Sequence, residues 1–342
     1  MSNLLPPQPV DSRVAYLGFP WATLIDLKMF ATHRLETIAR LDAALTDLAT
    51  QVAGYDRVLT VCQHINMRSY ADLFARAGVT DLYWAHAVRH QTHLPEAPQI
   101  RLHPFPLYPV QTAARDPHAD NPLLFSFVGA KAHPKYLSQV RSHIVELLSD
   151  DPHGCVIETT GWHYARIVYD RQIMDRAKPD AVLTDEAAAE RFRAVLARST
   201  FALCPSGTGP NSIRLWEAAT SGVIPVVLAD TYRPPAEATL WRAATTTCEE
   251  TSSAIAALPD RLAAIAADPA RLAYKRQALS ALTARYGPDR FVHDVLMTFP
   301  VTRPLPAVTA WDPAMTQPTT TLTGVRQVLR KAWTMAERLL PK

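Results

Sequence analysis

The sequence predicts an α/β protein built from two Rossmann-like parallel α/β domains that face a cleft. Short β-branched runs alternate with helical segments along the chain. Residues 201–235 read as a strand, a helix and a second strand in close succession, which is a parallel βαβ unit. A length of 342 residues is enough for two domains of ordinary size, and 48% hydrophobic and 20% charged residues are ordinary for a globular protein.

Residues 1–115 are expected to form the first domain. Apolar, β-branched runs predict strands at 14–19, 57–62 and 81–85, and residues 99–103 are expected to be extended. Residues 70–77 predict a short helix closed by Gly78. A longer helix precedes it, with one apolar face formed by Leu35, Ile38, Leu41, Leu45 and Leu48.

Residues 121–300 are expected to form the second domain, after a polar interdomain linker at 111–122. Strands are predicted at 123–128, 155–160, 201–204 and 223–228. Helices are predicted at 135–149, 187–198, 213–221, 253–267, 270–286 and 290–297. The first of these helices has five apolar side chains expected to face inward: Leu137, Val140, Ile144, Leu147 and Leu148. Residues 301–342 are expected to be a proline-rich connection followed by an amphipathic helix at 325–340.

The loop after the strand at 201–204 offers the most specific chemistry. Gly207 and Gly209 allow backbone N–H groups to approach an anion, and the helix that begins near Ser212 presents its positive dipole end. Arg214 can pair with a diphosphate, and Glu217, one turn further along the same face, can accept hydrogen bonds from ribose hydroxyls. The alternative for these two residues is a surface ion pair, but the helix around them is mostly apolar.

Four linked pieces of this stretch resemble the sugar-nucleotide-binding segment of exostosin-type glycosyltransferases. They are CPSG at 204–207, S-x-R-x-x-E-A at 212–218, G-x-x-P-V at 222–226 and D-x-Y-x-x-P at 230–235. FSFVGA at 125–130 resembles the first strand and glycine turn of the same lobe. The resemblance implies a GT-B fold and inverting, metal-independent transfer from a nucleotide sugar, commonly UDP-linked, without a cofactor. The donor-binding residues it implies are Gly129, Ser206, Gly207, Asn211, Ser212, Arg214 and Glu217.

Three residues of the first domain are candidates for the catalytic base. Asp26, His64 and His86 each follow a predicted strand, so all three should lie at the carboxyl edge of that sheet. Inverting transfer needs a base that takes the proton of the acceptor hydroxyl, and Asp or His suits that task. Glu158 and His163 are weaker candidates, and the sequence does not decide among them.

Other enzyme classes fit parts of the same stretch. Gly207, Gly209 and Ser212 also form G-x-G-x-x-S, the outline of an NAD(P)-binding oxidoreductase fingerprint with Asp230 as its acid, but that class leaves Arg214 and Glu217 unexplained. GDP-fucose-type fucosyltransferases have a loosely similar helix and strand in this position. A sugar-nucleotide binder without catalysis is a third alternative.

No metal or disulfide site is expected. His86, His90 and His93 have a spacing compatible with a metal, but a surface loop without nearby carboxylates explains them better. The sequence has no D-x-D, so a metal-bridged diphosphate is not expected. The 4 cysteines are widely spaced, which favours reduced thiols.

The expected acceptor is a hydroxyl of a glycan or lipid-linked glycan in cell-surface polysaccharide synthesis. A net charge of +3 is too small to indicate nucleic acid as a partner. The first residues show no signal peptide, so a cytoplasmic location is expected. The apolar stripe and basic flank at 325–340 favour peripheral contact with the inner face of the membrane, although the same stripe could pack on a domain.

Overall fold

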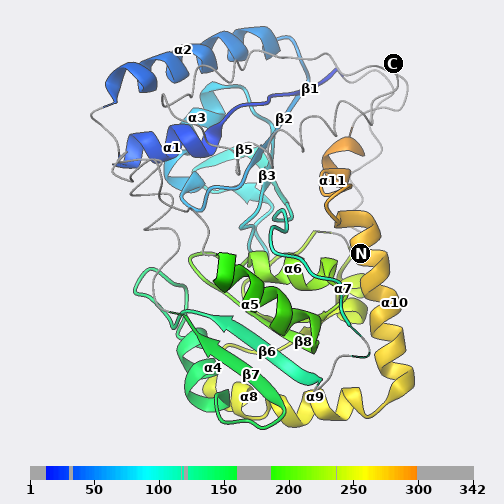
Figure 1. Ribbon diagram of the computed structural model, residues 1–342. Coiled ribbons are helices and arrows are strands. Elements are labelled where there is room, and N and C mark those ends of the chain that lie inside the picture. The colour runs from blue at the N-terminus through cyan, green and yellow to red at the C-terminus, as the bar shows by residue number, and fades with distance from the viewer. Residues whose placement is uncertain are drawn as a thin grey trace. The chain divides into compact units, whose positions relative to one another are not determined.

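The computed structural model describes residues 13–30, 34–116, 118, 122–159, 186–235 and 237–298 (Figure 1). The chain divides into two compact units. Unit 1 holds the described residues up to Phe105 and from Val292 onward, and unit 2 holds those from Pro106 to Phe291. Each unit has its own sheet of parallel strands with helices, which confirms the predicted pair of Rossmann-like α/β domains.

The sheet of unit 1 has the order β1-β2-β3-β5-β4. Its parallel strands are β1 (Val14–Tyr16), β2 (Arg57–Cys62), β3 (Asp81–Trp84) and β5 (Ala97–Pro104), and β4 (His93–Leu94) pairs antiparallel at the edge. The helices are α1 (Trp21–Phe30), α2 (Leu35–Val52), the 3₁₀ helix η1 (Met67–Tyr70), α3 (Ala71–Arg76) and α11 (His293–Leu296).

Trp21 anchors the core of unit 1. Its ring stacks on Phe74 with 4.1 Å between centroids, and both side chains are buried. Its Nε1–H donates to Thr60 Oγ1 at 2.7 Å, and the Thr60 hydroxyl donates to Leu17 O at 2.7 Å. The one polar atom of the indole is therefore satisfied inside an apolar core, and α1 is fixed against β2.

The sheet of unit 2 has the order β10-β9-β8-β6-β7, and all its strands are parallel. The strands are β6 (Leu123–Gly129), β7 (Gly154–Glu158), β8 (Ser199–Pro205), β9 (Ile224–Leu228) and β10 (Thr246–Thr247). The helices are α4 (Val140–Leu148), α5 (Glu186–Ala197), α6 (Ile213–Thr220), α7 (Ala238–Ala244), α8 (Ser252–Ala256), α9 (Leu258–Ala266) and α10 (Pro269–Tyr286). Helix α5 covers β6 and β8 (Figure 1).

Two helices differ in detail from their predicted apolar faces. Leu35 is the first residue of α2 and is 69% exposed, because the helix buries Leu41, Leu45 and Leu48 further along. Helix α4 begins only at Val140, so Leu137 precedes it and is 54% exposed. Leu147 lies off the centre of the α4 stripe and is also exposed, and Val145 is buried there instead.

The helix α1 was not predicted. Asp26 was expected only to follow the first strand, but residues 21–30 are helical and Asp26 lies in the middle of the helix. Four apolar side chains of this short helix are buried: Trp21, Leu24, Ile25 and Leu27. Because apolar residues occupy so much of its circumference, the helix shows no clear 3.6-residue pattern in the sequence.

Residues 106–116 lie in unit 2 rather than in the first domain or a linker. Gln111 N–H donates to Glu217 Oε1 at 2.8 Å, and Ala113 N–H donates to Ser221 Oγ at 3.1 Å. These two hydrogen bonds hold the segment against α6. At the other boundary, Tyr83 Oη donates to Asp294 O at 3.2 Å, which places α11 in unit 1.

The predicted proline-rich connection and C-terminal helix, at 301–342, lie outside the described residues. The same holds for His163 and for much of the predicted connection between β7 and α5. Within the part of the chain that the structure describes, no helix is both long and apolar enough to cross a membrane.

A buried carboxylate joins three strands of unit 1. Asp81, at the start of β3, is fully buried and accepts hydrogen bonds from Arg57 at 2.7 and 3.0 Å, from Arg101 at 2.9 Å and from His103 at 2.9 Å. Burial opposes ionisation, but the hydrogen bonds from His103, Arg57 and Arg101 outweigh it and hold the pKa of Asp81 well below its usual range. The carboxylate is therefore ionised whenever the unit is folded near neutral pH.

Asp81→Asn should lower the free energy of unfolding by about 3 kcal/mol at pH 7, because it leaves two buried or half-buried guanidinium groups without a counter-charge. The pKa of Asp81 is lower in the folded than in the unfolded chain, so its stabilisation is complete above the unfolded value of about 3.9 and declines as the pH falls further. Urea titrations at pH 7 and pH 3 should show the gap between wild type and variant narrowing at pH 3. Asp72→Asn is the matched control, since Asp72 is 71% exposed.

Candidate functional site

The carboxyl edge of the unit 2 sheet has a topological switch point. Strand β6 comes first along the chain but lies between β7 and β8, so the connections after β6 and β8 lead in opposite directions. In open parallel sheets, ligands bind beyond the carboxyl ends of the strands at such a point. Gly129 ends β6 and Ser206 directly follows β8, so two of the predicted donor-binding residues lie here.

Gly129 is surrounded by an aromatic ring and two guanidinium groups. A Cβ at this position would lie 2.9 Å from Cζ of Phe127, 3.1 Å from Nη2 of Arg214 and 3.2 Å from Nη1 of Arg141. Each of these distances is shorter than an ordinary carbon contact. The missing side chain therefore lets both arginines reach the backbone at the end of β6.

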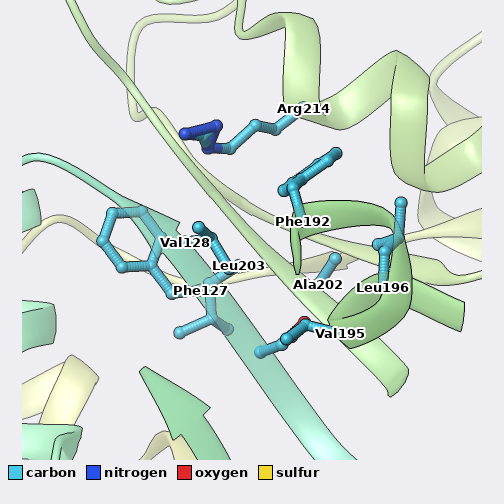
Figure 2. A pocket seen from close by; sticks show the side chains of 9 residues that line it. Phe127, Val128, Phe192, Val195, Leu196, Ala202, Leu203 and Arg214 are labelled. Carbon is cyan, nitrogen blue, oxygen red and sulfur yellow. The ribbon is translucent and has the colours of Figure 1, made fainter. Parts of the chain in front are cut away.

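Arg214 is held by aromatic rings rather than by an acid. Its guanidinium lies 5.5 Å from the centre of the Phe192 ring and 6.0 Å from that of Phe127, and Figure 2 shows it reaching from α6 towards both. Its Nε is buried and has no hydrogen-bond partner among the described residues. Burial lowers the pKa of Arg214, while Glu217 opposes that shift. The cavity beside it measures only about 10 Å³, so it does not itself hold a substrate.

Arg141 approaches the same point from the other side of the switch. It is the second residue of α4, as Arg214 is the second residue of α6. Its Nε–H donates to Ser206 O at 2.8 Å, and its guanidinium lies 5.1 Å from the centre of the Tyr136 ring. Burial, and then the like charge of Arg214, lower the pKa of Arg141 to about 10. Arg141 therefore remains positively charged at neutral pH.

Neither arginine forms an ion pair within the residues that the structure describes. Two neighbouring positive charges without an acid between them repel each other, and a bound anion would remove that repulsion. Guanidinium groups bind phosphate oxygens with paired, directional N–H donors. This arrangement is chemically suited to a diphosphate.

The loop after β8 is fixed by a carboxylate that the sequence analysis did not single out. Glu250 Oε1 accepts hydrogen bonds from the hydroxyls of Ser206 and of Ser138, the latter at 2.6 Å. Glu250 Oε2 accepts from Asp230 N–H at 3.0 Å. In the same loop Gly207 N–H donates to Gly209 O at 3.0 Å. The Gly207 amide is thus hydrogen-bonded within the loop. This differs from its expected role as a hydrogen-bond donor to a phosphate.

Asn211 and Ser212 lead into α6 and are both buried. Asn211 Oδ1 accepts from Trp216 Nε1–H at 2.9 Å, which fixes the start of the helix against its own first turns. Ser212 is the N-cap residue, but its side chain accepts no hydrogen bond from the helix. The N-terminus of α6 is therefore not neutralised by its cap, and Arg214 lies in its first turn.

Glu217 is buried and holds the segment 110–111. Its Oε1 accepts from Gln111 N–H at 2.8 Å. Burial raises the pKa of Glu217, while the amides of Gln111 and Val110 and the charge of Arg214 oppose that shift. In this structure the carboxylate contacts backbone amides of unit 2, so its expected contact with ribose stays a prediction.

In unit 1 the structure brings two of the three catalytic candidates together. His64 follows β2, Asp26 lies on α1, and His64 Nε2 lies 3.0 Å from Asp26 Oδ1 although the residues are 38 positions apart. Trp84 Nε1–H donates to His64 O at 3.0 Å and so links the end of β3 to the same loop. This pairing was not apparent in the sequence, because α1 was not predicted.

The third candidate, His86, is buried beyond the end of β3 and packs edge-on against Trp84. Its Nδ1 has no hydrogen-bond partner among the described residues. Burial lowers the pKa of His86 to about 4. A hydrogen bond with the Gln63 backbone opposes this shift, and the nearby His64 lowers the pKa by a smaller amount. His86 is thus neutral at physiological pH and a weak base. Glu158, the remaining described candidate, lies at the end of β7 in unit 2, and its Oε2 is 3.5 Å from Lys131 Nζ.

The family comparison identifies the class of the protein. A family model of the Exostosin GT47 domain matches residues 80–257, which is just over half of the chain. The chain belongs to the exostosin GT47 family. It is therefore a glycosyltransferase. Enzymes of this class in general transfer a sugar from a nucleotide-sugar donor to a glycan acceptor. The GT47 match includes Gly129, Arg141, Arg214 and Glu250, whereas Asp26 and His64 precede it.

The chain is also similar to solved structures, among them the following two. The sucrose-phosphate synthase of Thermosynechococcus elongatus aligns with a TM-score of 0.39 and 14% identity over 71% of this chain and 66% of that one, so the GT47 chain spans about two thirds of its length. A protein described as a UDP-N-acetylglucosamine 2-epimerase from Listeria monocytogenes aligns with a TM-score of 0.34 and 11% identity over 83% of this chain and 96% of that one. The comparison with curated proteins found no significant match.

Arg141, Phe192 and Glu250 are the site residues of this GT47 chain that sequence reasoning missed. A local signal existed for Arg141, because it follows the glycine turn after β6 as Arg214 follows the glycine loop after β8. Phe192 and Glu250 had no such signal. Their contacts depend on how α5 packs on β8, and on the segment after β10, a strand that pairs with β9.

Gly129→Ala should weaken nucleoside diphosphate binding about tenfold, or about 1.4 kcal/mol, because the added methyl displaces Arg141 and Arg214. The methyl would also lie 2.9 Å from Cζ of the buried Phe127 ring, so we expect a modest fall in the melting temperature of the unliganded protein beside the loss of affinity. Titration calorimetry with UDP and differential scanning fluorimetry measure the two effects. Gly54→Ala is the control, since its Cβ would meet nothing closer than Arg13 Nη1 at 3.8 Å. Unchanged UDP affinity in Gly129→Ala would contradict the assignment.

Proposed function

We propose that the protein is an inverting glycosyltransferase that needs no metal ion and moves a sugar from a UDP-linked donor to a hydroxyl of a glycan or lipid-linked glycan. Family membership gives the transferase class and the general kind of donor and acceptor. The proposal adds that the donor is UDP-linked, that the transfer inverts the anomeric configuration, and that it needs no metal ion or cofactor. It also adds a role in cell-surface polysaccharide synthesis and a cytoplasmic location with peripheral contact at the inner membrane face.

One observation carries the donor part of the proposal, namely the approach of Arg141 and Arg214 to Gly129 at the switch point. Sugar transfer breaks the bond between the anomeric carbon and the diphosphate oxygen, so negative charge builds up on the leaving diphosphate. Fixed positive groups at that position stabilise the transition state more than the ground state. In other enzymes a divalent ion supplies this charge.

The GDP-fucose and NAD(P) alternatives predict a different nucleotide. Both ligands also carry a diphosphate, so the two arginines do not discriminate between them. The acid of the dinucleotide fingerprint, Asp230, accepts from Glu250 N–H at 3.3 Å and so contacts protein rather than solvent alone. Melting curves of the wild type with UDP, GDP, CMP and NADH separate the classes, and only UDP should raise the melting temperature clearly under the proposal.

Arg214→Ala and Arg141→Ala should each lower kcat/KM by roughly a hundredfold, or about 3 kcal/mol, because each removes a charge that faces the developing diphosphate anion. The double variant should lose less than the product of the two, since both arginines act on one group. Turnover should be unaffected by EDTA. Arg191→Ala is the control, as Arg191 is exposed on α5. Wild-type turnover in Arg214→Ala, or loss of turnover in EDTA that Mg²⁺ restores, would contradict the proposal.

A further inference from the structure

Both ring nitrogens of His64 are engaged. Nδ1 accepts a hydrogen bond from Asn66 N–H at 3.0 Å, so in this arrangement it carries no hydrogen. The hydrogen of the neutral ring is then on Nε2, which donates to Asp26 Oδ1 at 3.0 Å. His64 therefore cannot accept a proton unless the bond to Asn66 breaks.

Asp26 is the more accessible member of the pair. Its side chain is 16% exposed, whereas that of His64 is 7% exposed. The third candidate, His86, is buried and is a weak base at neutral pH. A carboxylate that is fixed by a donor on one oxygen and reaches solvent is well suited to accept a proton from a bound hydroxyl.

We infer that Asp26 is the general base of the transfer and that His64 is a positioning residue that holds its carboxylate. This inference rests on the proposed function. The acceptor oxygen forms a bond to the anomeric carbon while the bond from that carbon to the diphosphate oxygen breaks, and the leaving nucleoside diphosphate keeps the electron pair. The acceptor hydroxyl proton passes to Asp26, which later releases it to solvent.

Among the described residues, the titratable groups around the pair of Asp26 and His64 include Cys62 on β2, Tyr70 on η1 and His86 beyond the end of β3. Burial raises the pKa of Cys62 to about 12 and raises that of Tyr70, so both are uncharged at neutral pH. His86 is also uncharged there.

Asp26→Asn should lower kcat by at least about a hundredfold, because asparagine keeps the hydrogen bond from His64 but cannot take the proton. His64→Ala should lower kcat only about tenfold. It should also move the acid limb of the kcat/KM profile to higher pH, because a carboxylate that loses a donor is protonated more easily. His64→Gln, which retains an N–H donor, should recover part of the lost kcat and part of the shift of the acid limb. His93→Ala is the control, since His93 is exposed on β4.

The outcomes separate this inference from the proposed function. UDP should raise the melting temperature of all four variants as it does in the wild type, and a wild type that does not respond to UDP would overturn the donor assignment instead. With UDP binding intact, wild-type turnover in Asp26→Asn overturns the base assignment. A loss in His64→Ala as large as in Asp26→Asn, with no shift of the acid limb, would make His64 the base.

A basic hollow on unit 2 gives an independent second inference. It has a volume of about 410 Å³ and lies beside β10, at the ends of α7, α9 and α10. Arg242, Arg261, Arg271 and Lys275 line it, from three different helices, and no acidic residue does. Because these side chains converge from separate elements, the hollow is not simply the solvated face of one helix.

Two of the four cations of the hollow are hydrogen-bonded to backbone carbonyls, and within the described residues the other two are not. Lys275 is buried, and its Nζ donates to Thr245 O at 2.6 Å and to the carbonyls of Arg242 and Ala243 at 3.4 Å, so it offsets the negative end of α7. Arg261 Nη2–H donates to Thr247 O at 3.0 Å. The guanidinium groups of Arg242 and Arg271 are exposed and form no hydrogen bond or ion pair with described residues.

The geometry points to a phosphate site in this hollow, separate from the donor site, that takes a phosphate group of a soluble ligand or of an anionic lipid headgroup. Arg242 and Arg271 would bind the phosphate oxygens with their unengaged N–H donors, and Arg261 would bind from the β10 side. Such a group would remove the mutual repulsion of the three arginines.

The test is made with the donor site saturated by UDP, so that Arg141 and Arg214 do not contribute. Inorganic phosphate should then raise the melting temperature of the wild type by about 3 °C further. The double variant Arg242→Gln, Arg271→Gln should lose this rise but keep the response to UDP. Arg191→Gln with Arg290→Gln is the control, because it removes the same charge from exposed positions of unit 2.

Sedimentation with vesicles distinguishes the two sources of phosphate. Vesicles of phosphatidylcholine with phosphatidylglycerol should pellet the wild type and the control but not the double variant if the ligand is a lipid headgroup. A phosphate response without vesicle binding assigns a soluble ligand. An equal phosphate response in the double variant and the wild type, or no response to phosphate or vesicles in the wild type, overturns the site.

Discussion

Two positive charges that approach each other without an acid between them are unfavourable, and the carboxyl edge of unit 2 is built to hold such a pair. Arg214 lies over the rings of Phe127 and Phe192, and Arg141 over that of Tyr136. Aromatic faces attract cations without neutralising them. A backbone carbonyl accepts from Arg141, and a glycine leaves the space between. The pair is therefore held in place before any ligand arrives, which is the condition under which electrostatic catalysis is effective.

The features that could be predicted from sequence are those encoded locally. The run RVLTVC became β2 with the predicted bounds, and the β8, α6 and β9 unit was recognisable because glycines mark the ends of its segments. The same glycines indicated which edge of the sheet would bind an anion. Arg214 was found because it lies in the first turn after that loop. The family match then confirmed what the spacing of these motifs suggested.

The features that were missed depend on packing between distant segments. Helix α1 is buried around much of its circumference, so its sequence shows no amphipathic period, and the pairing of Asp26 with His64 was hidden with it. The partners of Asp81 come from strands 20 to 24 residues away, and only strand register brings them together. Arg141 approaches Arg214 because β6 and β8 are neighbours, although β7 comes between them in sequence.

Glu250 has a consequence for how the edge of this sheet moves. Its carboxylate accepts from the loop after β8, from the loop after β9 and from the segment before α4, which are far apart along the chain. When any one of these segments opens, the acid loses a donor while remaining partly buried, and its bonds to the others weaken. The three segments therefore form one cooperative opening unit. Their amides should exchange hydrogen together, and the donor site should order or loosen as a whole rather than loop by loop.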